Sequence, residues 1–420
     1  MANDNNSELV SVVHPVCCGL DVHKEKISAC LIMNNALIEQ AQVVEIKEFG
    51  AFTDDLISLR DWLLKHKCQI VAMESTGIYW RPIHNILEGY LEVILVNARH
   101  IKNVPGRKTD IEDSKWLAGL LRHGLLRGSF IPPRQVREWR DLTRLRRTYV
   151  ETLGDYKRRT HKLFESANIK IDSVVSDLFC MTGRNLMELL ISDGSLGSTA
   201  EVARCARGKL KKKVEELHRA IQGFFTDHHR YVLVSLLKTI GILEGEIEAI
   251  NVRLRSVMTE QQGLVERLMG IAGISEISAR AILAEIGPTL ETFKSSAALS
   301  SWSGLCPGNN ESAGKRFSGR SPVRKHHLKT IMMEVAWAAV KVKGSYYRDK
   351  YYRLKARRGS KRAIVAIAHR LLKVVYHVIK DGVAFKDLGE SFLARKHEAA
   401  NLARLKRQAA QIGCEVVAQA

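Results

Sequence analysis

The sequence predicts an α/β domain at the N-terminus, a long helical middle region and a mainly helical C-terminal domain. Up to about residue 133, short apolar runs typical of strands come between segments with helical spacing. From about 137 to 260, apolar residues recur every three or four positions among dense charge, and from about 265 glycine-bearing turns return. We therefore expect domains at 1–136, 137–264 and 265–390, followed by a basic helical tail at 391–420.

The N-terminal region alternates strands with helices. A β-like run begins at Cys17 after a polar leader, and Pro132-Pro133 closes the region. Such alternation, with acidic residues at the strand ends, indicates an α/β domain whose function lies at the edge of a sheet. The expected strands are 17–22, 26–32, 42–46, 69–73 and 91–96, and the expected helices are 49–65 and 110–121.

The middle region is expected to form long helices. Apolar residues between Leu233 and Leu254 repeat at three- and four-residue spacing, which indicates helical hairpins or a coiled coil. Arginines crowd its start, where any single one is as compatible with a solvated helix face as with a nucleic-acid contact. The candidate nucleic-acid contacts here are Arg137, Arg140, Arg144, Arg147 and Arg158.

The C-terminal region begins with a pattern of two short helices around a turn. The stretch from Leu268 to Gly287 resembles a helix-hairpin-helix, in which Gly270 and Gly273 would let the backbone approach a phosphate held by helix N-terminal amides. A plain helix–turn–helix packing unit is the alternative. The segment from Lys341 to Lys380 is expected to be helical and basic, with tyrosines at 346, 347, 351 and 352.

The charge of the chain points to a polyanionic partner. Lys and Arg total 65 against 45 Asp and Glu, a formal net charge of +20, which is unusual for an enzyme of small metabolites. Nucleic acid is the first partner to consider. No apolar run approaches the length of a membrane span, and the first residues lack the features of a signal peptide. The eight cysteines show no CxxC spacing, which argues against a zinc site or a disulfide scaffold and fits a cytoplasmic protein.

Four carboxylates stand out by position. Asp21 ends the first expected strand and Glu74 ends a later one, while Asp110 and Asp113 are three apart on one helix and share a face. Glu112 points roughly 100° away from Asp113 on that helix and is left out. Like charges gathered at a sheet edge repel unless a cation lies among them, and oxygen-only ligands favour Mg²⁺ or Mn²⁺. Taken singly, Asp21 or Asp110 is equally compatible with a turn or helix cap.

In these motifs the chain resembles the DEDD transposases of bacterial insertion sequences, family 110, and the related Piv-type DNA invertases. The N-terminal part of the resemblance covers Gly19–Lys24, Glu74–Trp80, Val96–Arg99 and Gly106–Asp113. The C-terminal part covers Gly270–Gly287 and Ser300–Gly314, including Gly304-Leu305-Cys306-Pro307 and Glu311-Ser312-Ala313-Gly314. The chain departs from the family where Ser114 stands in place of a frequent Ala, and where Glu311-Ser312-Ala313-Gly314 replaces a pattern closer to Ser-Ser-Gly.

The resemblance implies a RuvC-like, RNase H-like first domain whose tetrad, Asp21, Glu74, Asp110 and Asp113, binds Mg²⁺. It also implies a C-terminal transposase domain with a serine nucleophile, which maps onto Ser312, with Ser318 and Ser321 as alternatives. A serine ester conserves the energy of the DNA phosphodiester, so strands can be rejoined without ATP. The basic residues expected to offset phosphate charge there are Lys315, Arg316, Arg320, Arg324 and Lys325.

The resemblance further implies DNA as substrate, a structured guide RNA, and a homo-oligomer in a bacterial, nucleoid-associated setting. Two alternatives stay open. One is a RuvC-like junction-resolving endonuclease that uses water as its nucleophile, and the other is a non-catalytic nucleic-acid-binding protein. Inversion of one chromosomal segment in place of transposition is a functional variant of the main interpretation.

Overall fold

The computed structural model describes residues 11–34, 42–75, 77–97, 110–192, 197–307, 310–312, 315–318, 326–411 and 413. The chain forms two compact units, Met1–Ile131 and Pro132–Ala420. The boundary falls at the proline pair, and the expected domain end at 136 lies inside the first turn of a helix that begins at Arg134. Within the described residues, no helix combines the length and apolarity needed to cross a membrane.

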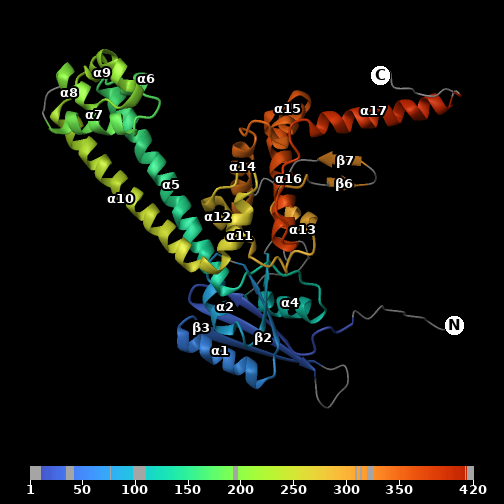
Figure 1. The fold of residues 1–420 in the computed structure, drawn as a ribbon. Helices are drawn as coiled ribbons and strands as arrows, with labels where there is room; N and C mark the ends of the chain where they lie inside the picture. The colour runs from blue at the N-terminus through green and yellow to red at the C-terminus, as the bar shows by residue number, and fades with distance from the viewer. Residues whose placement is uncertain are drawn as a thin grey trace, which may run out of the picture. The chain divides into compact units, whose positions relative to one another are not determined.

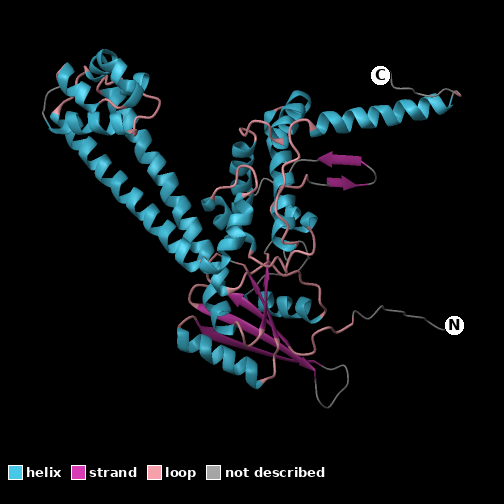
Figure 2. Ribbon diagram, in the orientation of Figure 1, coloured by secondary structure: helices cyan, strands magenta, loops and turns pink. Residues whose placement is uncertain are grey.

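The first unit is a five-stranded mixed sheet covered by helices (Figures 1 and 2). The strand order is β3-β2-β1-β4-β5; β1, β2 and β3 pair antiparallel, and β4 and β5 run parallel to β1. These features agree with the RNase H-like arrangement that the resemblance implies. The elements are β1 (Cys17–Val22), β2 (Lys26–Asn34), β3 (Gln42–Gly50), α1 (Thr53–Lys65), β4 (Ile70–Glu74), α2 (Trp80–Leu87), β5 (Glu92–Val96) and α4 (Asp110–Arg122).

One expected helix begins later than its spacing suggested. The sequence predicts a helix from residue 49 with Phe52 on its apolar face, but β3 continues to Gly50 and Phe52 is the N-cap of α1, 80% exposed. The register of β3 against β2 extends to the pair Lys26 and Gly50, so the ladder keeps these residues extended.

The second unit begins with a long antiparallel helix pair (Figure 1). Helices α5 (Arg134–Ser166) and α10 (Asp227–Val257) pack along each other, as the contacts of Arg146 with Asn251 and of Lys157 with Glu244 show. At their far end lies a small apolar core that includes Phe164, Leu186 and Leu217. The helices around that core are α6 (Ile171–Val174), α7 (Met181–Ser192), α8 (Thr199–Cys205), the 3₁₀ segment Gly208–Lys213 and α9 (Val214–Ile221).

The rest of the second unit is a bundle around α16 (Ser360–Lys380), which packs against α11, α13, α14 and α15 (Figure 1). Apolar side chains along α16, among them Ile367, Leu371 and Val375, are fully buried. The remaining elements are the 3₁₀ turn Thr259–Gln261, α11 (Gln262–Met269), α12 (Glu276–Ile286), α13 (Ser296–Trp302), β6 (Asn310–Ser312), β7 (Lys315–Ser318), α14 (His327–Ala339), α15 (Tyr346–Arg358) and α17 (Phe392–Gln411).

Candidate active site

Helix α4 covers the sheet face on which Asp21 and Glu74 lie. Side chains alternate between the two faces of a strand, so Asp21 shares a face with Cys17, and Glu74 shares one with Ala72. Cys17 and Ala72 pack in one core with Ala118 and other residues of α4. The intervening residues of both strands pack in the opposite core, with α1 and α2; they include Leu20 and Met73.

The register of the sheet places the two strand-end carboxylates beside each other. β1 and β4 run parallel, and the last pair of the ladder is Leu20 with Met73. The next residues on the two strands are Asp21 and Glu74, so their backbones are separated by about the 4.8 Å spacing of adjacent strands. The Asp21 side chain is 16% exposed, and its Oδ2 lies 3.0 Å from Nε2 of His23.

Gly19 lets α4 approach the strand that carries Asp21. A Cβ at Gly19 would lie 2.2 Å from the carbonyl oxygen of Ser114 and 2.5 Å from the amide nitrogen of Ala118. A larger residue two positions before Asp21 would therefore push the helix away. This role of Gly19 was not predicted from the sequence, although a glycine inside a strand, two positions before the acid, is the available signal.

Ser114, in the fifth position of α4, links this helix to β2, the strand that pairs with β1 opposite Asp21. Its hydroxyl is fully buried and lies 3.4 Å from the hydroxyl of Ser28, which pairs with Asp21 across β1 and β2. This contact gives Ser114 a structural role. Asp113, the preceding residue, is exposed, and Asp110 begins the helix. The positive end of the helix dipole favours carboxylates in this first turn.

The chemistry of the four donors fits a hard divalent cation. All are carboxylates, the ligand type that suits Mg²⁺ and Mn²⁺. The side chain of Asp110 lies outside the described part, and among the described side chains no three of the His, Cys, Asp and Glu type lie close enough together to hold a metal ion. The fold thus sets Asp21 beside Glu74 and α4 over that face.

The expected nucleophile lies in a two-stranded hairpin. Ser312 is the last residue of β6 and pairs with Lys315, the first residue of β7. Ser318 ends β7 and pairs with Asn310. The side chains of this hairpin, including Arg316, and the residues Arg320, Ser321, Arg324 and Lys325 lie outside what the structure describes.

Comparison with known proteins decides the family. Residues 18–169 match the family model DEDD_Tnp_IS110, described as a transposase. Residues 265–353 match a second model, described as the transposase IS116/IS110/IS902 family. The chain belongs to the IS110 family of DEDD transposases. Its family makes it an enzyme that cuts and rejoins DNA.

Two solved structures that resemble the transposase are of RuvC. Thermus thermophilus RuvC matches with 10% identity and a TM-score of 0.22, covering 27% of this chain and 99% of that one. T. thermophilus RuvC in complex with Holliday junction substrate also matches with 10% identity and a TM-score of 0.22, covering 28% and 100% of the two chains. No curated protein matched the transposase sequence.

Two of the arginines expected to contact nucleic acid make contacts within the second unit of the transposase. The Arg137 side chain is buried, and its Nη1 donates to the carbonyl oxygen of Pro132 at 3.0 Å. Arg140 is 11% exposed and donates from Nε to the carbonyl oxygen of Ala284 at 2.9 Å and from Nη2 to that of Glu285. Both guanidinium groups satisfy backbone acceptors.

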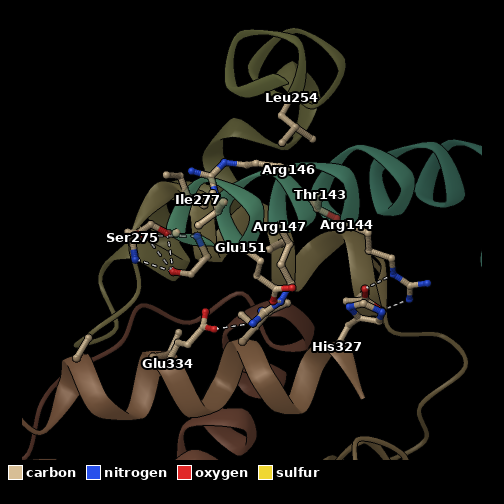
Figure 3. A pocket seen from close by; sticks show the side chains of 18 of the residues that line it. Thr143, Arg144, Arg146, Arg147, Glu151, Leu254, Ser275, Ile277, His327 and Glu334 are labelled. Carbon is tan, nitrogen blue, oxygen red and sulfur yellow. Dashed lines mark hydrogen bonds and ion pairs between the residues drawn. The ribbon is translucent and has the colours of Figure 1, made fainter. Parts of the chain in front are cut away.

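Arg144 and Arg147 line a cavity of about 870 Å³ bordered by α5, α10, α12 and α14 (Figure 3). Arg144 binds the Glu285 carboxylate in a bidentate manner, at 3.0 and 2.9 Å, and that carboxylate is only 3% exposed. Arg147 lies 2.9 Å from a Glu151 oxygen and 3.0 Å from a Glu334 oxygen. Arg144 and Arg147 therefore already have carboxylate partners.

His327, at the start of α14, also lines this cavity. Burial lowers the pKa of its imidazole, and the neighbouring Arg144 guanidinium lowers it further, whereas Glu285 opposes the shift. The neutral form is thus favoured.

Arg158 differs from the other expected contacts on α5. Its side chain is 68% exposed, and its one ion pair in the described part is with Asp155, one turn earlier. Of the five arginines, it is the one most accessible to a phosphate.

The two glycines of the expected helix-hairpin-helix differ in backbone conformation. The turn does lie between α11 and α12, but Gly270 has a helical φ of −61° and is the C-cap of α11. Gly273 has a φ of +85°, and a Cβ there would lie 2.5 Å from both Ala339 N and Val335 O. The close approach at Gly273 is that of α14.

Proposed function

We propose that this transposase cuts DNA through Ser312 and rejoins it from the resulting phosphoserine ester, with Asp21, Glu74, Asp110 and Asp113 holding Mg²⁺ or Mn²⁺. The observation that carries the proposal is the placement of Asp21 and Glu74 on adjacent parallel strands, on the face covered by α4. The order of the motifs and the two family matches support it.

The divalent ions would stabilise charge on the reacting phosphate and help to activate the hydroxyl. The chain's own contribution begins with His23, whose Nε2 contacts Asp21 and so orients that carboxylate. The Ser28–Ser114 contact holds α4 over the same face. Both contacts restrict the donor positions before any ion binds.

In the cutting step, the Ser312 hydroxyl oxygen forms a bond to phosphorus while the bond from phosphorus to one sugar oxygen breaks. The serine loses its proton and the leaving sugar oxygen gains one, so the number of phosphate ester bonds is unchanged. Attack by the hydroxyl of another strand reverses the exchange and frees the serine. Lys315, Arg316, Arg320, Arg324 and Lys325 would balance the phosphate charge, and Arg158 would contact the backbone farther away.

A structured guide RNA would select the sites, and a homo-oligomer would bring the strands together. Base pairing would then supply sequence specificity, so the protein would mainly read nucleic-acid backbone. The dense positive charge of the chain supports this part of the proposal.

The metal test replaces each tetrad residue in turn: Asp21→Asn, Glu74→Gln, Asp110→Asn and Asp113→Asn. Each is expected to abolish strand cleavage across a Mg²⁺ titration while the protein stays folded. Glu112→Gln is the matched control, because it removes a carboxylate from the same helical turn on another face. Near-normal activity in any two tetrad variants would contradict a shared metal site.

The nucleophile test traps the reaction with denaturant and maps any DNA-linked peptide. Ser312→Ala should bind DNA and metal as the wild type does, yet form no covalent adduct, and Ser318→Ala should form it normally. An adduct at Ser318 or Ser321 would move the nucleophile within the same mechanism. Cleaved ends with free phosphate and no adduct would instead establish water as the nucleophile, as in a junction-resolving endonuclease.

A further inference from the structure

The most unbalanced charge in the described chain lies on α15 and the start of α16. Between Tyr346 and Arg362 there are eight Lys and Arg residues and one acid, Asp349. That acid accepts two hydrogen bonds from Nε of Arg353, at 2.8 and 3.0 Å. The exposed cations of this segment, here called the α15 cationic patch, are Arg353, Lys355, Arg357, Arg358, Lys361 and Arg362.

Most of the α15 cationic patch has no internal ion pair. In the part of the chain that the structure describes, Arg353 pairs with Asp349, and no carboxylate lies within ion-pair distance of the other five cations. Unpaired, hydrated cations at this density raise the local concentration of a polyanion.

The tyrosines of α15 divide into two groups. Tyr346, Tyr347 and Tyr351 are at most 5% exposed, so they belong to the core. Tyr352, in contrast, is 52% exposed, and Trp337 of α14 is 43% exposed. Exposed rings occur elsewhere on the protein, such as Phe224 and Tyr231, but these two lie beside the α15 cationic patch.

The two exposed rings share one buried aromatic neighbour. Both contact the buried ring of Tyr351, with centroid distances of 5.8 Å for Trp337 and 5.4 Å for Tyr352. The Arg348 guanidinium and the Lys355 ammonium each lie 5.8 Å from the Tyr352 centroid. Tyr352 is therefore an exposed ring that contacts a buried one, with two cations near its face.

We propose that Tyr352 and Trp337, together with the α15 cationic patch, bind an unpaired stretch of nucleic acid. Bases would stack on the two rings while the phosphates lie along the cations. Aromatic rings beside a cationic track are the combination that binds single strands, because every base has a stackable face. A duplex keeps its bases stacked internally and can use only the cations. The proposal uses none of the tetrad residues and not Ser312, and it does not require any of them to be catalytic.

The test uses the full-length protein and a twelve-nucleotide oligonucleotide with 2-aminopurine at its centre, in buffer without divalent ions. Binding is measured for three ligands of one sequence: the DNA single strand, the RNA single strand and the DNA duplex. Wild-type protein should change the 2-aminopurine fluorescence of a single strand, because the base stacks on a ring. Whichever of the DNA and RNA single strands binds more strongly identifies the source of the strand.

Tyr352→Ala should weaken single-strand binding about 5- to 150-fold, the range that corresponds to about 1–3 kcal/mol per stacked base. Duplex binding should stay unchanged. Tyr352→Phe, which keeps the ring, should bind single strands like the wild type. The buffer contains no divalent ion, so a failure of the proposed catalytic mechanism would not affect this result.

Three outcomes would overturn the inference. One is unchanged single-strand affinity in Tyr352→Ala, and another is an equal loss for single strand and duplex. The third is competition by polyglutamate as effective as that by the single strand, which would indicate a site for acidic protein. Should Tyr352→Ala misfold by circular dichroism, Tyr352→Leu, which fills the position without an aromatic ring, should show the same loss of single-strand affinity; an unchanged affinity would overturn the inference.

Discussion

Helices α5 and α15 are both rich in arginine, yet their cations have different surroundings. On α5, Arg140 and Arg144 lie against Glu285, and Arg147 lies between Glu151 and Glu334. On α15, the cations beyond Arg353 have no carboxylate at ion-pair distance within the described residues. The difference shows that charge density along a helix does not by itself indicate a nucleic-acid surface. What matters is whether packed neighbours supply acceptors.

The largest effect expected from this comparison is that of Glu285→Gln. The substitution leaves the Arg144 and Arg140 guanidinium groups without their buried carboxylate, and breaking a buried pair from one side costs about 3–5 kcal/mol. Chemical denaturation should show this loss in the free energy of unfolding. Glu334→Gln, whose side chain is 62% exposed, should cost less than about 1 kcal/mol. Equal effects would mean that Glu285 is no more structural than a surface acid.

Gly273→Ala should destabilise the same region by about 2–4 kcal/mol, because a Cβ at a φ of +85° meets the α14 backbone at 2.5 Å. Gly263→Ala is the matched control. Nothing lies within 4 Å of a Cβ there, and removing a helical glycine should stabilise by about 0.5–1 kcal/mol. If Gly273→Ala instead retained stability and lost only DNA affinity, the turn between α11 and α12 would be a phosphate-binding site rather than a packing position.

The double variant Arg357→Gln/Arg358→Gln tests the other side of the comparison. Each lost phosphate contact should lower the log–log salt slope of single-strand binding by about 0.7, so the pair should lower it by about 1.4. Arg147→Gln removes a cation that already has two carboxylate partners and should leave the slope unchanged. Measuring affinity at several salt concentrations gives both slopes. A larger decrease for Arg147→Gln would reverse the assignment of the two helices.

The smallest effect concerns pH. His327 faces Arg140, Arg144 and Arg147 of α5 and Glu285 of α12, and burial together with these arginines lowers its pKa in the folded state. The unfolded chain therefore takes up this proton first, at about pH 6.5, and stability falls as the pH falls below that value. His327→Gln should flatten the dependence of Tm on pH between about 7 and 5.5. An unchanged dependence would show that other groups cause it, such as His369, whose pKa is also lowered by burial.

Much of the first unit was predictable because its signals are local. Strand alternation, strand ends and the three-residue spacing of Asp110 and Asp113 depend only on nearby residues, and the strands and α4 lie where they were expected. The predicted start of α1 was wrong because the pairing of β3 with β2 keeps the chain extended to Gly50. The roles of Gly19 and Gly273 were not predicted, since the segments that approach them are far away in the sequence.

The sequence by itself determined which residue types stand at the strand ends, in the first turn of α4 and around Ser312, and so it determined the family. Only the tertiary structure decided that Asp21 stands next to Glu74 and that Arg140 and Arg144 form ion pairs with Glu285. It also decided that Tyr352 is exposed while Tyr351 is buried. The physical reason is distance along the chain. The periodicity of a strand or helix is set by its own backbone, whereas the partner of a charge or ring comes from whichever segment packs beside it. For Arg144, that partner is 141 residues away.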